Sequence, residues 1–527
     1  MTKVKSLAAA LLLCLPGAFA QPRLSAHDER DVLQMNKMSQ VLYIISTGYV
    51  DTVNMENLVE SGIKGMLSKL DPHSAYIGKE ELERDNESFG GNFEGIGIEF
   101  NVLQDSIVVV NTIPGGPSEM VGLLPGDRIV KVNGESVVGV KMTAVPKILR
   151  GPKGTEVNAE VIRKGVSEPL AFKIIRDKIP MNSLDAAYLI EKKTGYVKLN
   201  RFSATTNDEL QAALKSMKGI DALILDLRGN GGGLLDQAEA VAANFLEPGS
   251  LVVYTEGRSI DRMDFTSDTF GEPLFSKGKL VVLVDESSAS ASEIVAGAVQ
   301  DWDRGMIIGR RTFGKGLVQR QIPLVDGSAI RLTAAHYYTP AGRSIQKPYT
   351  AGDSESYYHD IMDRYASGEI TSDMKVVDSS LVYKTLVKGR TVYGGGGILP
   401  DVIVPADTSY YSSYWSKLTR AGVILEFVIT ELDKHRAEYH ARYRKFDVFD
   451  NEFTVSDSMM ADLVALGHKR EIDPDPEGLD RSDKELRNYV KALLAGRLWE
   501  DGDFYRVMNR ADKADIAKAL EVLGEMK

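Results

Sequence analysis

Two short segments near the middle of the chain contain side chains that can carry out nucleophilic chemistry. The first is the hydroxyl-rich run SASASE at 288–293, and the second is the run TFGKG at 312–316, which Gln319 follows closely. A serine hydroxyl can attack a carbonyl carbon when a base removes its proton, and a neutral lysine can be that base. The two segments together predict a hydrolase with a serine nucleophile and a lysine base.

A lysine acts as a base only where its pKa is lowered, because an exposed lysine is protonated at neutral pH. Phe313, Leu317 and Val318 lie close to Lys315 in the sequence, and apolar neighbours of this kind favour burial. Gln319 could orient the amine through a neutral hydrogen bond without raising its pKa. The local chemistry does not choose a nucleophile among the serines at 287, 288, 290 and 292.

Two other motifs overlap these residues and suggest different proteins. Gly309 to Lys315 fits most of a phosphate-binding P-loop, but Gly316 stands where such a loop has the serine or threonine that binds magnesium. The alternating apolar residues of 316–333 also predict strands where a P-loop needs a helix. The run GNGGG at 229–233 resembles the active-site loop of trypsin-like secreted proteases but contains no serine. Neither motif therefore accounts for the chain.

Alternating strands and helices from about residue 181 would position the serine and the lysine. Apolar runs at 222–227 and 280–285 predict buried strands. The first strand leads into the glycine loop, and the second leads into the serine segment, after which a helix is predicted over 292–300. The serines therefore lie at a strand-to-helix junction, where backbone N–H groups and the positive helix end favour negative charge.

Residues 86–180 differ from this pattern, because short β-like runs are separated by glycines. GIGIEF at 95–100, PGGPS at 114–118, LPGD at 124–127 and VNG at 132–134 follow one another in an order that resembles a PDZ domain. The implied ligand is the carboxy terminus of a polypeptide, whose strand would pair with the sheet edge. Its carboxylate would be held by the backbone N–H groups of Gly95, Ile96, Gly97 and Ile98. The alternative is a glycine-rich turn without a ligand.

From its N-terminal helical region to about residue 405, the chain resembles the carboxy-terminal processing peptidases, or tail-specific proteases. The resemblance rests on DPHS at 71–74, the PDZ-like segments, SASASE, FGKG, and the closing runs YYTPAG at 337–342 and GGILPD at 396–401. It implies that Ser290 is the nucleophile, that Lys315 is the general base and that Gln319 supports the base.

The resemblance also implies an oxyanion hole made of two backbone N–H groups. One belongs to Ala291, which follows the nucleophile, and the other belongs to a glycine of the GNGGG loop, for which Gly232 is the first choice. The sequence does not separate Gly231, Gly232 and Gly233 for this role. Glu293 is expected to make structural hydrogen bonds at the helix rather than to take part in catalysis.

The fold class implied by the resemblance is multidomain α/β. We expect a crotonase/ClpP-like α/β protease core with an inserted PDZ domain of β-rich α+β type, an N-terminal helical hairpin and a C-terminal helical domain. The expected ranges are a signal peptide at 1–20, a helical region at 21–85, the PDZ domain at 86–180, the Ser-Lys protease core at 181–405 and the C-terminal helical domain at 406–527.

Three local patterns refine this expectation. Apolar residues over 31–70 follow two helical stripes, which predict a packed hairpin core with flanks free for dimerisation. The polar stretch at 350–378 predicts an insertion or mobile loop. In the tail, Ser482 and Glu485 predict a capping box at the start of a helix.

The first twenty residues predict export. Lys3 and Lys5 precede an apolar run at 7–15, and the small-x-small run at 18–20 resembles a cleavage site, so we expect a secretory signal peptide and a periplasmic location. The run is too short to span a bilayer, and no later run predicts a transmembrane span. Cys14 is the only cysteine. Its acylation is disfavoured because bulky Leu13 precedes it.

The net charge of the full chain is −11, and loss of the two signal-peptide lysines would make it more negative. This balance disfavours nucleic acid and anionic membrane surfaces as partners. Neither a metal nor another cofactor is predicted. The expected partners are polypeptide substrates with free carboxy termini, with a homodimer through the helical regions and an adaptor as further candidates.

The predicted function is a secreted serine endopeptidase that recognises protein carboxy termini through a PDZ domain and cleaves through a Ser-Lys acyl-enzyme. One alternative is a PDZ scaffold on a catalytically inactive crotonase-like core, which the joint presence of Ser290, Lys315 and Gln319 disfavours. The other is a Ser-Lys protease that degrades signal peptides, which the PDZ-like segments disfavour.

Overall fold

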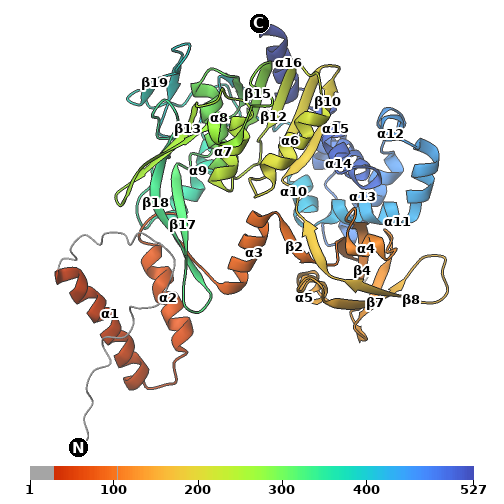
Figure 1. The fold of residues 1–527 in the computed structure, drawn as a ribbon. Coiled ribbons are helices and arrows are strands. Elements are labelled where there is room, and N and C mark those ends of the chain that lie inside the picture. The colour runs from red at the N-terminus through yellow and green to blue at the C-terminus, as the bar shows by residue number, and fades with distance from the viewer. Residues whose placement is uncertain (1–28, 104, 527) are drawn as a thin grey trace, which may run out of the picture.

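A computed structural model describes residues 29–103 and 105–526 of the chain (Figure 1). The predicted signal peptide and Cys14 lie outside the described residues. Among the described helices, none is long and apolar enough to cross a membrane.

The larger sheet of the region predicted as the protease core has the strand order β10-β11-β12-β15-β16-β21. Strand β10 is antiparallel to β11, and the remaining neighbours are parallel, with Asp226 at the end of β12 in register with Leu283 of β15. The apolar runs predicted as buried strands are β12 and β15, and every residue of β12 is buried. The strands are β10 Leu184–Glu191, β11 Thr194–Leu199, β12 Ala222–Asp226, β15 Lys279–Val284, β16 Met306–Gly309 and β21 Val402–Ile403.

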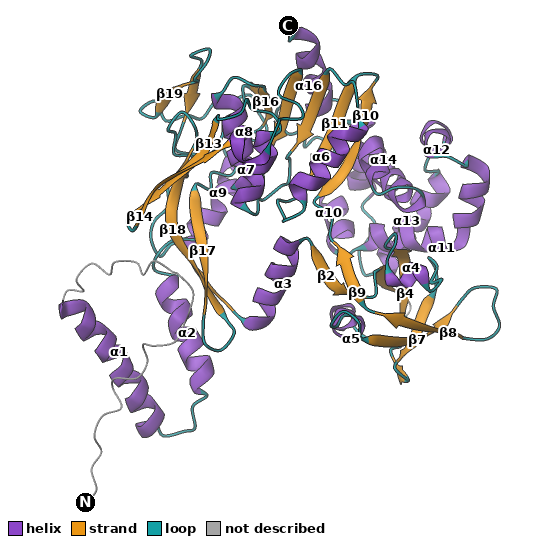
Figure 2. Ribbon diagram, viewed as in Figure 1, coloured by secondary structure: helices purple, strands orange, loops and turns teal. Residues whose placement is uncertain are grey.

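Helices cover both faces of this sheet, as Figure 2 shows. One face packs against α6 (Thr206–Ser216), α7 (Leu235–Ala243) and α8 (Ala291–Asp301), whose apolar side chains share a core with those of the strands. The other face packs against α16 (Asp515–Glu525). Because both faces of the sheet are covered, the strands are continuous apolar runs and do not alternate between apolar and polar residues.

A second sheet of the protease core has the order β1-β18-β13-β14, with β17 also paired to β18. Strand β1 comes from the N-terminal region and pairs with β18 far along the chain, so Ala75 lies opposite Arg331. A short 3-10 helix, η2 (Ser267–Phe270), follows β14, and β19 (Val382–Lys384) and β20 (Thr391–Tyr393) form a separate hairpin. The sheet strands are β1 Ala75–Ile77, β13 Leu251–Gly257, β14 Ile260–Thr266, β17 Leu317–Pro323 and β18 Ala329–Tyr338.

The PDZ-like region folds as a separate sheet with its own core, in the order β3-β4-β5-β7-β8, with β6 paired to β5. Strands β2 and β9 pair with each other and connect this module to the protease core. The strands are β2 Asn92–Gly95, β3 Ile98–Leu103, β4 Ser106–Thr112, β5 Arg128–Val132, β6 Glu135–Ser136, β7 Glu156–Ile162, β8 Leu170–Ile175 and β9 Asp177–Pro180. The helices are α3 Lys79–Gly90, which precedes β2, α4 Pro117–Met120, η1 Met142–Ala144 and α5 Val145–Leu149.

The N-terminal helices are α1 (Glu29–Gly48) and α2 (Met55–Leu67), as the helical stripes predict. The expectation that these stripes form a packed core is wrong, however. Met35 is 58% exposed and Tyr49 is 60% exposed, and the part of the chain that the structure describes leaves most of the apolar stripe of α1 uncovered. The reason is that α1 extends away from the rest of the molecule in Figure 1.

The stretch at 350–378, predicted to be an insertion or a mobile loop, contains a helix, α9 (Ser354–Ala366). Tyr357 and Arg364 of this helix are buried against the protease core. The mobile-loop alternative is wrong because the helix buries Tyr357 and Arg364, whereas Tyr358, Met362 and Tyr365 are exposed, so its apolar residues do not form one clear stripe. An Asp353 cap followed by Tyr357, Ile361 and Arg364 at helical spacing is the signal that could have revealed it.

The C-terminal region is helical, as predicted, and has a core of its own. The predicted capping box is wrong, because helix α14 starts earlier, at an Asp475 cap, and Ser482 lies inside it with its hydroxyl donated to the Tyr410 carbonyl. The helices are α10 Ser413–Arg420, α11 Val423–Tyr443, α12 Phe446–Glu452, α13 Asp457–Lys469, α14 Pro476–Leu498 and α15 Gly502–Ala511, before α16 returns to the protease sheet.

Candidate active site

Three neighbouring parallel strands end at the candidate site. Strand β12 leads into the glycine loop at 228–233, β15 leads into the serine segment, and β16 leads into the lysine segment. Because parallel neighbours end at the same edge of a sheet, loops that are far apart in the sequence meet there. The Ala289 N–H donates to the Asn230 carbonyl at 3.0 Å, and the Phe313 N–H donates to the Ser288 carbonyl at 3.0 Å.

The structure distinguishes Ser290 from Ser288 and Ser292. The hydroxyls of Ser288 and Ser292 are buried and donate to the carbonyls of Leu227 at 2.8 Å and Asn230 at 2.9 Å. Ser290 is partly exposed at the N-cap of α8, and its hydroxyl donates to no group in the described chain. It also has a φ of 57°, a conformation that non-glycine residues rarely adopt and that is enriched at functional sites.

Lys315 is partly buried, and within the described residues its Nζ has neither a hydrogen-bond nor an ion-pair partner. Burial lowers its pKa to about 8, and the positive charge of Arg331 acts in the same direction. Glu293 and Asp71 oppose this shift. A substantial fraction of this lysine is therefore neutral near pH 8, which is the property that a base requires.

The backbones of Ser290 and Lys315 are held by the same two side chains. Glu293 Oε2 accepts the N–H of Ser290 at 2.8 Å and that of Lys315 at 2.9 Å. The Tyr337 hydroxyl lies against the carbonyl oxygens of both residues, 3.2 Å from that of Ser290. We call this arrangement the Glu293–Tyr337 clamp. It fixes the main chain of the nucleophile segment relative to the lysine segment.

Glu293 also binds the lysine segment through its other oxygen, which accepts from the Thr312 hydroxyl at 2.5 Å and the Gly314 N–H at 2.8 Å. The carboxylate is fully buried, and burial raises its pKa to about 7 although these four donors oppose the shift. The structural hydrogen bonds expected of Glu293 are present, but no local sequence pattern indicates that they cross to a second loop. Tyr337 was expected only as part of a segment that closes the core.

The glycines of the 229–233 loop have three different environments. A Cβ on Gly232 would lie 2.8 Å from Ser290 Cβ and 3.0 Å from the Ala291 nitrogen, whereas a Cβ on Gly231 would meet nothing within 4 Å. Gly233 lies instead against the Phe202 backbone. Gly232 is thus the glycine beside the serine, but in this structure its N–H donates to Asn230 Oδ1 at 2.9 Å. The Ala291 N–H has no acceptor among the described residues.

Gln319 lies on β17, opposite Thr333 of β18. Its Nε2 donates to the Leu317 carbonyl at 3.2 Å and to the Thr333 hydroxyl at 3.4 Å. The structure therefore brings Ser290 and Lys315 into one clamp, whereas it gives Gln319 no hydrogen bond to either of them in the described chain.

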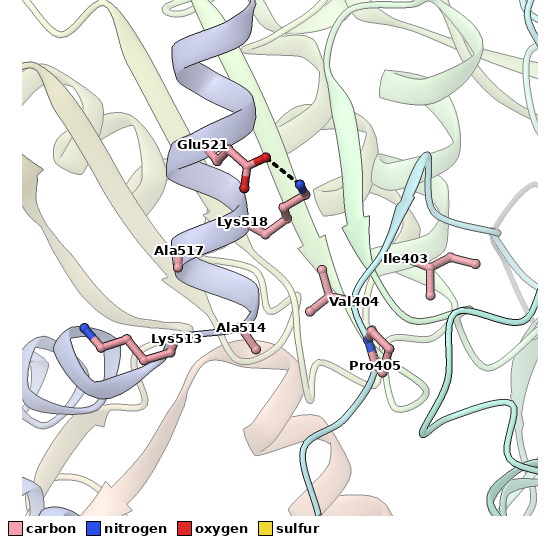
Figure 3. A pocket seen from close by; sticks show the side chains of 8 residues that line it. All are labelled: Ile403, Val404, Pro405, Lys513, Ala514, Ala517, Lys518 and Glu521. Atoms are coloured by element: carbon pink, nitrogen blue, oxygen red, sulfur yellow. Dashed lines mark hydrogen bonds and ion pairs between the residues drawn. The ribbon is translucent and has the colours of Figure 1, made fainter.

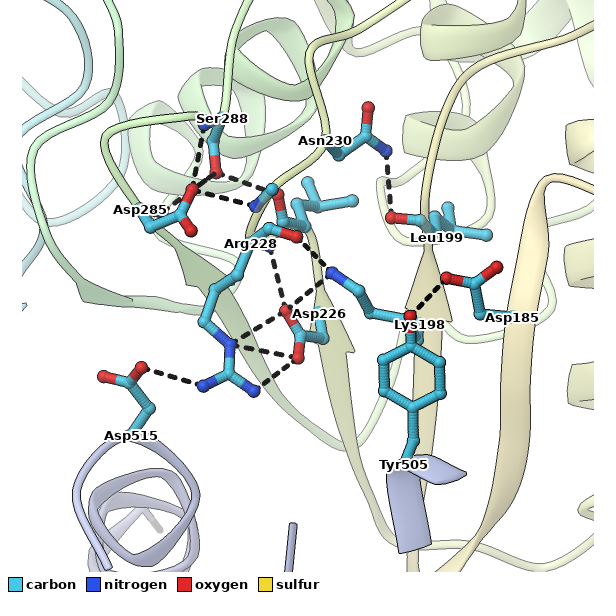
Figure 4. Close-up of polar contacts among 12 residues, drawn as sticks. Asp185, Lys198, Leu199, Asp226, Arg228, Asn230, Asp285, Ser288, Tyr505 and Asp515 are labelled. Carbon is cyan, nitrogen blue, oxygen red and sulfur yellow. Dashed lines mark hydrogen bonds and ion pairs between the residues drawn. The ribbon is translucent and has the colours of Figure 1, made fainter. Parts of the chain in front are cut away.

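A buried charge network supports the glycine loop from below (Figure 4). Asp226, at the end of β12, pairs with Arg228 at 2.6 Å and accepts the Tyr196 hydroxyl at 2.7 Å. Arg228 also reaches Asp512 at 2.9 Å and Asp515 at 2.8 Å, near the start of α16. Although burial opposes it, the charge of Arg228 holds the pKa of Asp226 well below its usual range. Arg228, the first residue of the glycine loop, is thus anchored to the C-terminal helices.

The predicted carboxylate loop of the PDZ-like module is a buried turn. Gly97 has a φ of 73°, and the carbonyls of Ile96 and Gly97 accept from Ser118 at 3.0 Å and Ile113 at 3.1 Å. The N–H groups of Ile96 and Gly97 donate to nothing in the part of the chain that is described. Buried N–H groups normally have partners, so this turn suits an anionic ligand. Strand β3 beside it is at the edge of its sheet.

Two clefts lie elsewhere in the protease core. One, of about 270 Å³, is lined by residues of β21 and α16 together with the Lys518–Glu521 ion pair (Figure 3), and it contains none of the candidate catalytic residues. The other, of about 400 Å³, is lined by His336, Gln346 and Lys347 among others. It adjoins the lysine segment, because the Gly316 N–H donates to Gln346 Oε1 at 2.8 Å.

Comparisons with known protein families agree with this organisation. Residues 193–356 match the model of peptidase family S41, residues 95–174 match a PDZ domain, and residues 19–81 match the N-terminal domain of the activating protease CtpB. Residues 414–501 match a family of unknown function.

Individual relatives point to the same class. The carboxy-terminal-processing protease of Bartonella bacilliformis is 39% identical over 333 residues, which cover 62% of this chain and 76% of the relative. The carboxy-terminal processing protease CtpB of Bacillus subtilis is 34% identical over 63% of this chain and 70% of its own length. Among solved structures, a photosystem II D1 C-terminal processing protease is 30% identical, covers 58% of this chain and 89% of its own, and has a TM-score of 0.33.

The chain belongs to the carboxy-terminal processing peptidases of family S41. It is a serine protease of the carboxy-terminal processing type that carries a PDZ domain. The predicted family and fold class are confirmed.

Proposed function

We propose that this protease is exported and cleaves polypeptides through an acyl-enzyme on Ser290, with Lys315 as the general base. The observation that carries the proposal is the convergence of three loops at one sheet edge, where a partly exposed serine and a lysine with a lowered pKa share the Glu293–Tyr337 clamp. A lysine with a pKa of about 8 has a usable neutral fraction at the pH of most cells.

In the first step the Ser290 hydroxyl attacks the scissile carbonyl carbon while the Lys315 amine takes its proton. The negative oxygen of the tetrahedral intermediate is held by the Ala291 N–H and the Gly232 N–H, and each such donor is worth roughly 3 kcal/mol. When the intermediate collapses, the ammonium of Lys315 gives its proton to the leaving amine. Lys315 then takes a proton from water, which hydrolyses the ester and restores Ser290.

Two movements are needed before this chemistry can start. The Lys315 Nζ must reach the Ser290 hydroxyl, because they are not hydrogen-bonded in this structure. The Gly232 N–H must also leave Asn230 Oδ1 to face the oxyanion. Catalytic hydrogen bonds often tighten only when substrate binds. We assign to Gln319 the role of holding the Lys315 amine through its free carbonyl oxygen.

The PDZ module is proposed to bind the substrate's carboxy terminus. The unpaired N–H groups of Ile96 and Gly97 would hold the carboxylate, with Gly95 and Ile98 completing the turn, and the peptide would add a strand to β3. Because this module joins the protease core through β2 and β9, ligand binding could also reposition it and complete the catalytic site. Deletion of residues 90–178 should then abolish or derange cleavage of tailed substrates, and an unchanged rate and selectivity would contradict this gating.

The exposed apolar stripe of α1 supports self-association as part of the proposal. Val32, Met35 and Met38 are exposed on this helix, and a second copy would cover them. Met35→Glu with Met38→Glu should convert a dimer into a monomer, as measured by light scattering after size-exclusion chromatography. A monomeric unaltered protein would contradict this part. An adaptor could dock on the C-terminal helices, which have their own core.

The deciding experiment incubates the purified chain, lacking residues 1–20, with an unfolded polypeptide that ends in apolar residues. Ser290→Ala and Lys315→Ala variants are tested beside it. We expect cleavage only by the unaltered protein, and a fluorophosphonate probe should label it on Ser290. An inert unaltered protein would favour the alternative of a PDZ scaffold, and normal cleavage by either variant would exclude the Ser-Lys mechanism.

The location is tested separately. Expression of the full chain in a bacterial host should give a periplasmic protein whose N-terminus is Gln21. Retention in the cytoplasm with residues 1–20 intact would contradict the export proposal, and acylation of Cys14 would show a lipoprotein instead.

A further inference from the structure

The DPHS segment at 71–74 forms a buried turn against the catalytic hairpin of β17 and β18. Asp71 Oδ1 accepts the N–H groups of His73 at 2.9 Å and Ser74 at 3.0 Å, and its other oxygen accepts the Ser74 hydroxyl at 2.5 Å. The turn continues into β1, which pairs with β18. A segment far upstream of the protease core is therefore part of the sheet that carries Gln319.

Thr333 of β18 connects this turn to Gln319. The Thr333 hydroxyl donates to Asp71 Oδ1 at 2.9 Å, and the Thr333 N–H donates to the Ser74 hydroxyl oxygen at 3.1 Å. On the other side, the same Thr333 hydroxyl oxygen accepts from Gln319 Nε2 at 3.4 Å. Asp71, Thr333 and Gln319 thus form a continuous chain of hydrogen bonds.

The direction of these hydrogen bonds follows from the chemistry of the Asp71 carboxylate. An ionised carboxylate only accepts hydrogen bonds, so the single proton of the Thr333 hydroxyl must point toward Asp71. The Thr333 oxygen then has only lone pairs to offer, and Gln319 must turn its NH₂ group toward it. Although burial opposes it, the hydrogen bonds from Ser74, the His73 N–H and Thr333 lower the pKa of Asp71, so this carboxyl is ionised at neutral pH.

We propose that Asp71 is a positioning residue of the active site, which acts through the Thr333 hydroxyl to fix the amide orientation of Gln319. With its NH₂ group turned to Thr333 and Leu317, the Gln319 Oε1 is the end that remains free, and it has no partner among the described residues. A free carbonyl oxygen can accept an N–H from the Lys315 amine and leave the lone pair of that amine for the serine proton. This inference rests on the proposed role of Gln319.

We call the hydrogen-bonded series Asp71, Thr333 and Gln319 the relay. The charges around Lys315 give this relay a second measurable effect. The Asp71 carboxylate raises the pKa of Lys315, as does that of Glu293, whereas Arg331 lowers it. His73, in the same turn, contributes no charge near neutral pH, because burial and the Lys315 and Lys347 charges lower its pKa to about 4. Removal of the Asp71 charge therefore moves the titration of Lys315 to lower pH.

The main test uses the pair Thr333→Val and Thr333→Ser. Valine keeps the shape of threonine without the hydroxyl, so kcat should fall about tenfold, the effect of one hydrogen bond, with KM unchanged. Serine keeps the hydroxyl and should restore kcat to within about twofold. If Thr333→Val is as active as the unaltered enzyme, the relay is excluded.

Asp71→Asn tests the charge. We expect a lower kcat and an acid limb of kcat/KM that moves to lower pH, whereas a purely structural turn would lower the melting temperature and leave the limb in place. Asp326→Asn is the matched control, because Asp326 makes the same kind of turn with Ser328 at the far end of this hairpin and has no link to Gln319. An unmoved limb in Asp71→Asn contradicts the relay.

Gln319→Ala separates this inference from the proposed function. If the relay acts through Gln319, Thr333→Val should have little further effect in a Gln319→Ala background, because coupled residues are not additive. A fully active Gln319→Ala enzyme would exclude both the support by Gln319 and the relay, while Ser290→Ala and Lys315→Ala would still test the dyad. An impaired Gln319→Ala enzyme with additive Thr333→Val would exclude the relay alone.

Discussion

The main chain and the reactive atoms of the candidate site are held in opposite ways. The N–H groups of Ser290 and Lys315 donate to Glu293 Oε2, and the Tyr337 hydroxyl contacts the carbonyl oxygens of both residues. Glu293 and Tyr337 are themselves buried. The Lys315 Nζ and the Ala291 N–H have no partners in the described chain, and the Ser290 hydroxyl donates to nothing. The fold therefore fixes the main-chain positions of the two reactive residues. The final contacts of their reactive atoms form only when substrate binds.

Breaking the clamp at Glu293 should have the largest effect. In Glu293→Gln the NH₂ group would face donors on either side. These are the N–H groups of Ser290 and Lys315, or the Thr312 hydroxyl and the Gly314 N–H. We therefore expect kcat to fall by about 10³-fold. The measurement is steady-state cleavage of a peptide with a free carboxy terminus, and circular dichroism checks the fold.

The matched control is Glu286→Gln in the same loop, because Glu286 pairs with Arg310 outside the clamp. Its kcat should stay within about threefold. Equal losses in the two variants would mean that the clamp has no special role.

Filling the space beside Ser290 should have the next largest effect. Gly232→Ala places a Cβ 2.7 Å from the Ala289 carbonyl oxygen and forces a φ of 99° on alanine, so we expect about a 10²-fold loss of kcat together with a lower melting temperature. Gly231→Ala, where a Cβ meets nothing within 4 Å, should be close to unaltered. The reverse order of damage would assign the oxyanion role to Gly231.

The pH dependence should show which protonation states the site needs. Lys315 must be neutral to accept a proton, and burial lowers its pKa to about 8, so kcat/KM should rise about tenfold per pH unit below pH 8 and level off above it. Protonation of Glu293, with a pKa raised to about 7 by burial, removes an acceptor from the clamp and should steepen the acid limb further below pH 7. A profile that is flat from pH 6 to pH 9 would contradict the role of Lys315.

Tyr337→Phe should have the smallest effect, because it removes one hydroxyl and leaves Glu293 in place. We expect about a tenfold loss of kcat with little change in KM. Tyr338→Phe is the control, because Tyr338 stacks on Tyr254 and does not contact the clamp. If Tyr337→Phe matches this control in a single-turnover assay, Glu293 alone holds the two segments together.

The sequence predicts those parts of the site that depend on local pattern. The buried strands before the glycine and serine loops and the helix after Ser290 agree with the prediction, because continuous apolar runs and a small-residue helix start are local signals. The choice of Ser290 came only from the family resemblance. The structure adds the physical reason, since Ser288 and Ser292 give their protons to carbonyls some sixty residues earlier in the chain.

What could not be predicted depends on contacts between distant segments. The four donors to Glu293 come from two loops, and the link from Asp71 to Thr333 spans most of the protease core in sequence. The prediction that the apolar stripe of α1 is buried is wrong for a related reason. Amphipathic spacing shows that a helix has an apolar face, but it does not show what covers that face.

The ion pairs from Arg228 to Asp512 and Asp515 join the glycine loop to residues near the end of the chain, which are synthesised last. A chain is synthesised from its N-terminus, so Ser290 and Lys315 are made long before the two aspartates that pair with Arg228. Until those aspartates are made, Arg228 has only Asp226 of its three acidic partners, and the glycine loop lacks its ion pairs to the C-terminal helices. We therefore expect the glycine loop beside Ser290 to reach its final position only after the C-terminal helices have folded.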